Sequence, residues 1–209
     1  EGGVPIEIDY INDKSLNKEY FNNNVLKLSD LFYIPISVHP KTYKGINYNA
    51  SSFLYGLTIF SENEIVCNVF FRPGKTYYFH DFQVDNEYFI IYLNSVDVDT
   101  LNSIIFPKES ILNSIKFVKG NKILLIHKHT KKQKWIDVPK HMDFPSLHTA
   151  YFKRYNNIVT FDIPMITNKF DIGNIEDISN FNDIYLHRFI IVYNGVFSHI
   201  NPLKYGHNN

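Results

Sequence analysis

The chain has 209 residues, 44% of them hydrophobic, and its 21 basic residues balance 21 acidic ones. This composition is typical of a globular domain, and a net charge of zero argues against a nucleic-acid-binding surface. Isoleucine occurs 27 times and alanine twice, a bias that favours strands over helices.

The N-terminal residues 1–24 are polar and rich in asparagine, so they predict a loosely held arm with one helical turn near Ser15–Tyr20. A first strand is expected over 31–38. Within it, Pro35 lacks the N–H group that a ladder needs and indicates a sheet edge or a bulge. Residues 39–50 are expected to form a long loop.

From Ser51 to Leu93, apolar side chains recur at every second position in four successive runs. Because a strand turns alternate side chains to opposite faces, this period predicts an antiparallel meander with one apolar side. Turns are expected at 61–63, at Arg72–Lys75 and at 85–86. The side chains assigned to the shared face are Phe53, Tyr55, Leu57 and Ile59, then Ile65, Cys67, Val69 and Phe71, then Tyr77 and Phe79, and finally Phe89, Ile91 and Leu93.

Two predicted strands, 89–93 and 189–193, are apolar on both faces. A large apolar surface is rarely left exposed. We therefore expect a helix, the N-terminal arm or another subunit to cover the second face of the sheet.

The second half of the chain predicts further hairpins. The spacing over 97–116 predicts one or two short helices, and 167–183 is expected to be a loop or a short helix. No sequence repeat or domain boundary is visible, so 1–209 is expected to be a single domain with 25–209 as its β-barrel. The expected hairpin partners are 123–129 with 135–138, 149–155 with 158–163, and 186–193 with 196–200.

About ten antiparallel strands in sequence order favour an all-β fold, an up-and-down β-barrel with one or two short helices. A two-sheet β-sandwich is the alternative, because it fits the strand count nearly as well. The lumen of a small barrel holds one small ligand, whereas a sandwich is filled by its own side chains.

Histidines are the main candidates for chemistry. His127 and His129 share a strand face and would chelate a metal if His141, His148 or Asp143 came near. The lysines around this pair favour a solvated hairpin tip instead. His80 precedes Asp81, but neighbouring strand residues point to opposite faces, so a core or lumen position is favoured over an acid–base pair.

Cys67 is the only cysteine, which excludes an intramolecular disulfide. It alternates with Ile65 and Val69, so it is expected to face inward, where burial raises the thiol pKa and lowers reactivity. The sequence contains no nucleotide-binding, nucleophile-elbow or metalloprotease motif. These observations predict a non-enzymatic protein with no catalytic residue, no metal site and no cofactor.

The segment 29–36 resembles the opening strand of the lipocalins, which carries Gly-x-Trp-Tyr. Asp30 stands in place of the Gly and Phe32 in place of the Trp, while Tyr33 is retained. Residues 182–185 resemble the family's Thr-Asp-Tyr turn. The resemblance implies a barrel whose closed end is formed by Phe32 and Arg188.

The same resemblance implies binding or transport of a small hydrophobic ligand such as a fatty acid, sterol, retinoid-like or porphyrin-like molecule. It also implies a secreted or secretory and vacuolar location after removal of a leader, with the cytoplasm as the alternative. The expected partners are this ligand and a second copy of the chain, without nucleic acid or a transmembrane segment. The residues expected to bind the ligand are Tyr55, Leu57, Val69, Phe71, Tyr78, His80, Phe89 and Ile91.

Two other functions stay open. A β-sandwich whose second apolar face is a protein interface would be a non-enzymatic interaction domain. A hydrolase or isomerase would use His80 or His148 with a partner that the sequence does not identify.

Overall fold

The computed structural model describes residues 6–9, 14–19, 39–53, 55–61, 64–98, 115–166, 184–192 and 197–203. Within this part of the chain, every strand pairing is antiparallel. The strands β1 (Ile6–Asp9) and β2 (Lys14–Glu19) pair with each other as a separate two-stranded sheet. The helical turn predicted near Ser15–Tyr20 is therefore wrong.

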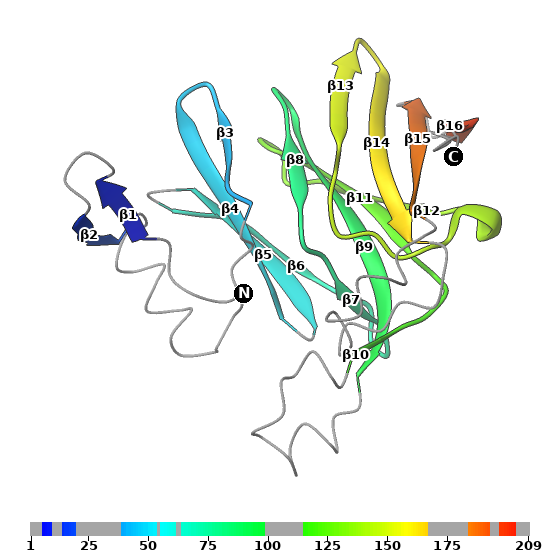
Figure 1. Ribbon diagram of the computed structural model, residues 1–209, viewed down its shortest axis with the longest axis horizontal. Helices are drawn as coiled ribbons and strands as arrows, with labels where there is room; N and C mark the ends of the chain where they lie inside the picture. The colour runs from blue at the N-terminus through cyan, green and yellow to red at the C-terminus, as the bar shows by residue number, and fades with distance from the viewer. Residues whose placement is uncertain are drawn as a thin grey trace, which may run out of the picture.

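The other strands form three sheets that follow one another along the chain and stand side by side (Figure 1). The first sheet has the order β3 (Lys41–Tyr43), β4 (Ile46–Phe53), β5 (Gly56–Ser61) and β6 (Ile65–Phe70). The third sheet has the order β13 (Tyr151–Tyr155), β14 (Ile158–Ile166), β15 (Ile184–Val192) and β16 (Phe197–Leu203).

The middle sheet is built around the long strand β9 (Tyr88–Val98). β8 (Phe82–Val84) and β11 (Lys122–His127) pair with the same residues of β9, so they lie on its opposite edges. The other strands of this sheet are β7 (Thr76–Tyr78), β10 (Ile115–Phe117) and β12 (Gln133–Asp137).

The strand pairings place β7 along one edge of β9 and β10 along the opposite edge. β7 continues the line of β8 along β9. The backbone of Ser95 bonds to the other side, accepting from the N–H of Val118 at 2.9 Å and donating to Oδ1 of Asn121 at 2.7 Å. The sheet is therefore four strands wide: β7 with β8, then β9, then β10 with β11, then β12.

Three four-stranded antiparallel meanders in succession are typical of the blades of a β-propeller. The all-β, antiparallel prediction is confirmed, but the up-and-down barrel and the two-sheet sandwich are both wrong. The turn at Arg72–Lys75 explains part of the error. It is a hydrogen-bonded turn with Gly74 at a φ of +73°, as predicted, but it leads from β6 into the next sheet instead of forming a hairpin.

The strand β9 is buried on both faces, which confirms that the apolar run over 89–93 needs a cover on each side. Neighbouring sheets cover the two faces of β9, in place of the helix, N-terminal arm or second subunit that the sequence analysis expected. One face packs against the first sheet, with Phe89, Ile91 and Leu93 joining Leu57, Ile59, Val69 and Phe71 in one core cluster. The other face packs against the third sheet, with Ile90 and Tyr92 joining Phe161, Ile163, Phe189 and Ile191 in a second cluster.

The first apolar run is split by a turn that the sequence did not predict. β4 ends at Phe53, which pairs with Gly56 at the start of β5, so the chain reverses between them. Tyr55 lies in this turn with 65% of its surface exposed, whereas Leu57 and Ile59 are fully buried.

The long loop predicted over 39–50 is also wrong, because β3 and β4 form a hairpin there. Lys44 and Gly45 both have positive φ angles, +51° and +76°, as a two-residue hairpin turn requires. Lysine rarely adopts this conformation, which hid the turn in the sequence.

The later hairpins are confirmed: β11 pairs with β12, β13 with β14, and β15 with β16. Residues 97–98 extend β9 and residues 115–116 belong to β10, so the helices predicted over 97–116 do not form there. The rest of that segment, the strand predicted over 31–38, Phe32, and residues 167–183 lie outside the described residues.

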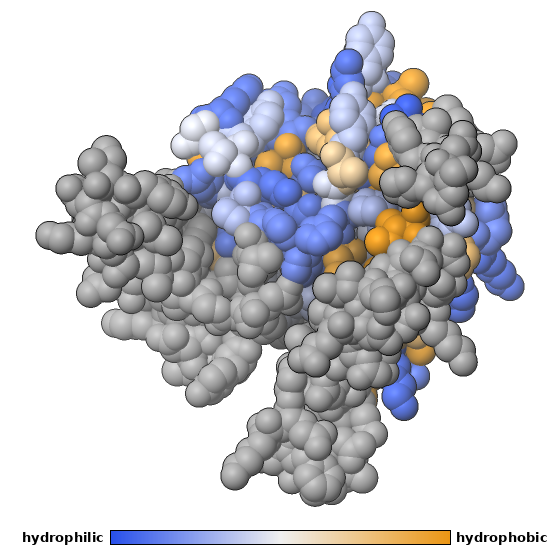
Figure 2. All heavy atoms as spheres, viewed as in Figure 1, coloured by the Kyte–Doolittle hydropathy of each residue, from blue (hydrophilic) through white to orange (hydrophobic). Residues whose placement is uncertain are grey.

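One 3-10 helix, η2 (Lys140–Met142), occurs in the described ranges, and no helix there has the length and apolarity to cross a membrane. Hydrophilic residues cover most of the described surface in Figure 2, and hydrophobic ones gather towards the third sheet. Ile158 and Ile184, both on that sheet, are 41% and 50% exposed. The third sheet therefore has apolar side chains on both faces.

Cys67 offers a test of the first core cluster. It packs against that cluster, as predicted, and burial raises the pKa of its thiol while Lys131 opposes the shift. Because only the thiolate reacts, we expect iodoacetamide at pH 8 to alkylate Cys67 at least about tenfold more slowly in the native chain than in urea. Mass spectrometry of timed samples measures both rates, and equal rates would show that the thiol is not shielded.

Candidate metal centre

Each of the three sheets brings one histidine to a common point. His39 lies two residues before β3, the first strand of the first sheet. His80 lies between β7 and β8, which form the first strand of the middle sheet. His148 lies in the extended segment that leads into β13, the first strand of the third sheet.

His80 sits in a bulge. Tyr78 pairs with Asn94 and Phe82 pairs with Ile91, so the three residues 79–81 oppose only two residues of β9. A bulge of this kind redirects the side chain of the extra residue and is common beside functional sites. The extra residue interrupts the strict alternation of side chains that the sequence analysis assumed along this strand.

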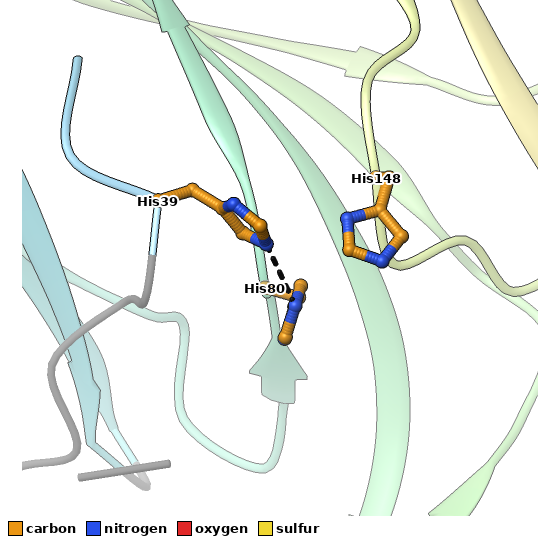
Figure 3. A group of neighbouring side chains, drawn as sticks. All are labelled: His39, His80 and His148. Atoms are coloured by element: carbon orange, nitrogen blue, oxygen red, sulfur yellow. Dashed lines mark hydrogen bonds between the residues drawn. The ribbon is translucent and has the colours of Figure 1, made fainter.

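The three imidazole rings meet edge to face (Figure 3). Their centroids are 4.8 Å apart for His39 and His80, 5.0 Å for His39 and His148, and 4.8 Å for His80 and His148. One ligand nitrogen from each ring lies within 4.8 Å of the other two. In the described part of the chain, this is the one group of three or more potential ligand side chains that comes together.

One pair of ring nitrogens has a spacing that fits two ligands of one metal ion. Nε2 of His39 and Nε2 of His80 are 3.0 Å apart. Two nitrogens bound at about 2.1 Å and at right angles to each other are separated by about 3.0 Å. A set of three imidazoles suits a first-row transition metal such as iron, cobalt, copper or zinc.

The surroundings of His39 favour its neutral imidazole, the form that binds metals. Burial lowers the pKa of His39 below its usual value, and the neighbouring His80, His148 and Lys41 act in the same direction, while Asp81 opposes them. A lowered pKa keeps the nitrogen lone pair available at neutral pH.

The second nitrogen of His80 faces a hydroxyl. Oη of Tyr78 lies 3.4 Å from Nδ1 of His80, on the side of the ring away from His39. A hydrogen bond from the remote ring nitrogen fixes the orientation of a ligating histidine. Tyr78 is therefore placed to orient His80.

A buried polar network holds the segment that carries His148. Oδ1 of Asn94 accepts a hydrogen bond from the N–H of Ser146 at 2.8 Å, and its Nδ2 donates to the carbonyl of Ser146 at 2.7 Å. The hydroxyl of Tyr92 donates to the carbonyl of Phe144 at 2.8 Å. Both interactions link this segment to β9, so the middle sheet positions the histidine of the third.

The residues predicted to line a barrel lumen are divided between core and surface. Tyr55 is exposed, while Tyr78 and His80 are half-buried near the histidine group. Their role in binding a ligand stays a prediction. The remaining five lie in the first core cluster, between two sheets: Leu57, Val69, Phe71, Phe89 and Ile91.

Arg188 is not at a barrel floor, because the fold is not a barrel. It forms a bidentate ion pair with Asp162 across β14 and β15, from Nε to Oδ1 at 2.8 Å and from Nη2 to Oδ2 at 2.7 Å.

The pair His127 and His129 lies at the tip of the β11–β12 hairpin. Nδ1 of His127 accepts hydrogen bonds from the backbone N–H groups of His129 and Thr130. This confirms the prediction of a basic hairpin tip. His148, one of the third ligands considered for this pair, joins His39 and His80 instead.

His39 was missed as a candidate because it fell in a predicted loop. The feature that could have identified it is its position, because each histidine of the group lies in or just before the first strand of a sheet. That regularity is visible only after the strands are divided into three sheets, since the sequence itself shows no repeat.

No family model matches the sequence, and no curated protein sequence matches it either. Solved structures do match. The cobalt-substituted apocarotenoid oxygenase of Synechocystis is 21% identical with a TM-score of 0.68, and the match covers 93% of this chain and 43% of that one. A chimera of that oxygenase with RPE65 is 19% identical with a TM-score of 0.70, over 96% and 44% of the two chains.

These matches show that the fold resembles part of the β-propeller of the apocarotenoid oxygenase. The chain spans less than half the length of the proteins it matches. That propeller has seven blades, and this chain forms three sheets of the blade type, which is consistent with a match over 43% of the oxygenase.

The resemblance to lipocalins is therefore wrong, and so is the lumen carrier that it implied. The prediction of a non-enzymatic protein is wrong as well, because the matching structures are oxygenases and the described residues include a metal-type histidine group. The interaction sandwich and the hydrolase or isomerase find no support in these matches. His80 and His148, which the last hypothesis named, do come together with His39.

Proposed function

We propose that this chain forms the metal-binding part of an oxygenase-type β-propeller, with His39, His80 and His148 as ligands of one divalent transition metal. The observation that carries this proposal is the meeting of three histidines from three separate sheets. By analogy with the apocarotenoid oxygenase that shares the fold, the substrate class is an elongated, apolar apocarotenoid.

The side chains have distinct tasks in this proposal. A bound metal supplies a Lewis-acidic, redox-active centre. His39 and His80 present their Nε2 atoms to the same point, and Tyr78 orients His80 through Nδ1. His148 is more exposed than the other two, so it marks the side of the group that is open to solvent.

Metal binding by the three histidines is the first test. The full chain is titrated with Co²⁺, and the visible absorption of the bound ion is followed. We expect one ion per chain, and each of His39→Ala, His80→Ala and His148→Ala should weaken binding by at least about 100-fold, since loss of even an outer partner costs 10–100-fold.

His129→Ala is the matched control, because His129 is an exposed histidine at the hairpin tip. This variant should bind Co²⁺ like the unchanged chain. If instead only His129→Ala lost the ion, the hairpin pair would be the metal site and the proposal would fail.

Oxygenase activity is a separate question from metal binding. The Fe²⁺-loaded full chain is incubated with an apocarotenoid under ¹⁸O₂, and products are analysed for the heavy isotope by mass spectrometry. We expect incorporation that disappears in His80→Ala. Tight Co²⁺ binding without any incorporation would leave a metal site but reject the oxygenase.

A further inference from the structure

Asp81 is a buried carboxylate beside the histidine group, and both of its oxygens are in use. Its side chain is 5% exposed. Oδ1 accepts from the N–H of Phe82 at 2.8 Å and pairs with Nζ of Lys41 at 2.7 Å. Oδ2 accepts from the N–H of Thr149 at 3.0 Å.

These contacts join the three chain segments that carry the histidines. Lys41 lies two residues after His39, Asp81 directly follows His80, and Thr149 directly follows His148. The three segments belong to different sheets and are far apart in sequence. One carboxylate therefore links the first strands of all three sheets at the point where the imidazoles meet.

Asp81 is not a fourth member of the ligand group. The group whose ligand atoms lie within 4.8 Å of one another contains the three histidines and no carboxylate. The hydrogen bonds and the ion pair of Asp81 are directed to two backbone N–H groups and to Lys41. Asp81 therefore acts on the histidines indirectly, through the residues next to them in the chain.

The burial of Asp81 makes these links strong. A carboxylate withdrawn from water is stable only when it is hydrogen-bonded and paired, and hydrogen bonds to an ionised group are about twice as strong as neutral ones. Replacing the carboxylate with an amide weakens these links together, because Lys41 loses its counter-ion and one of the two N–H groups faces an NH2 group instead of an acceptor oxygen.

We propose that Asp81 is a positioning residue that clamps the three histidine-bearing strands of neighbouring sheets into metal-binding geometry. The metal part of this inference rests on the proposed function. The clamp itself does not, since its hydrogen bonds and its ion pair join protein groups only.

The test compares two buried aspartates. Asp85 resembles Asp81: as whole residues the two are 8% and 6% exposed, Oδ1 of Asp85 accepts from the N–H groups of Glu87 and Tyr88 at 2.7 Å each, and Oδ2 pairs with Arg154. It lies in the turn between β8 and β9, outside the histidine group. Asp81→Asn and Asp85→Asn each remove the negative charge of a buried ion pair, so both variants should lower the thermal stability of the full chain.

Only Asp81→Asn should alter the metal site. We expect Co²⁺ binding to weaken by about 10–100-fold, with a change in the position and intensity of the visible bands that reports altered coordination. Asp85→Asn should keep both the affinity and the spectrum. Equal losses in the two variants, or an unchanged Asp81→Asn, would overturn the clamp.

A metal-free measurement separates the clamp from the proposed function. The imidazole rings are close enough for NMR cross-relaxation between their protons, and these signals should be present in the unchanged chain and lost in Asp81→Asn. If the chain bound no Co²⁺ but the signals behaved in this way, the clamp would stand and the metal site would fail. Signals that persist in Asp81→Asn reject the clamp.

Lys41→Met covers the case in which Asp81→Asn does not fold. This variant removes the ion pair and keeps both backbone hydrogen bonds of Asp81. We expect weaker Co²⁺ binding by about threefold and diminished contacts between the rings of His39 and His80. An unchanged spectrum and unchanged ring contacts would count against the clamp.

Discussion

Replacing Phe89 with alanine is expected to lower the free energy of unfolding by about 3–5 kcal/mol. Phe89 is fully buried between the first and middle sheets. Its ring meets that of Tyr48 edge to face at 5.2 Å, and the ammonium group of Lys128 lies 5.8 Å from its centre. Truncation removes these contacts and leaves a cavity that two rigid sheets cannot close. Urea denaturation followed by circular dichroism measures the loss.

Phe70 provides the matched control, since the same side chain is 73% exposed at the end of β6. Phe70→Ala should change the free energy of unfolding by less than about 0.5 kcal/mol. A loss below about 1 kcal/mol for Phe89→Ala would mean that the two sheets do not pack as described.

Arg188→Ala is expected to lower the free energy of unfolding by about 2–4 kcal/mol. The variant leaves the carboxylate of Asp162, 5% exposed, without its counter-ion. Removing one partner of a buried ion pair destabilises a protein by more than the pair itself contributes to stability, because an unpaired charge stays buried. The expected loss is below that of a fully buried pair because the Arg188 side chain is 35% exposed. The same urea titration measures it.

Replacing both partners distinguishes the buried charge from lost packing. Asp162→Leu combined with Arg188→Met removes the pair but keeps most of the volume, so it should be less destabilising than Arg188→Ala alone. If the double variant is less stable than Arg188→Ala, the unpaired carboxylate of Asp162 is not the cause of the stability loss in Arg188→Ala.

Local pairing was largely predictable from the sequence. Alternating apolar residues identified β6 and β9, a continuous apolar run identified β15, and turn residues such as Asn156-Asn157 identified the hairpins of β11 and β14. The two-faced burial of β9 followed from its uninterrupted apolar run over 89–93. The turn at Lys44-Gly45 was missed because a lysine with positive φ leaves no local signal.

The candidate site was only partly predictable. His80 was singled out beside Asp81, but alternation placed the two on opposite faces of a regular strand. The bulge at 79–81 changes that geometry, and it depends on the register between β7, β8 and β9. The contact of Asp81 with Lys41 and Thr149 joins residues far apart in sequence, so no local pattern contains it.

The sequence by itself determined an antiparallel all-β protein, its later hairpins and a strand that needed a cover on both sides. Only the tertiary structure decided that the strands divide into three sheets instead of closing into a barrel. The physical reason is one of range. Turn residues and alternating side chains determine structure over a few residues. Whether a strand forms hydrogen bonds with the next strand or packs against it in another sheet depends on contacts throughout the core. The same choice brings His39, His80 and His148 together, because each stands at the first strand of its own sheet.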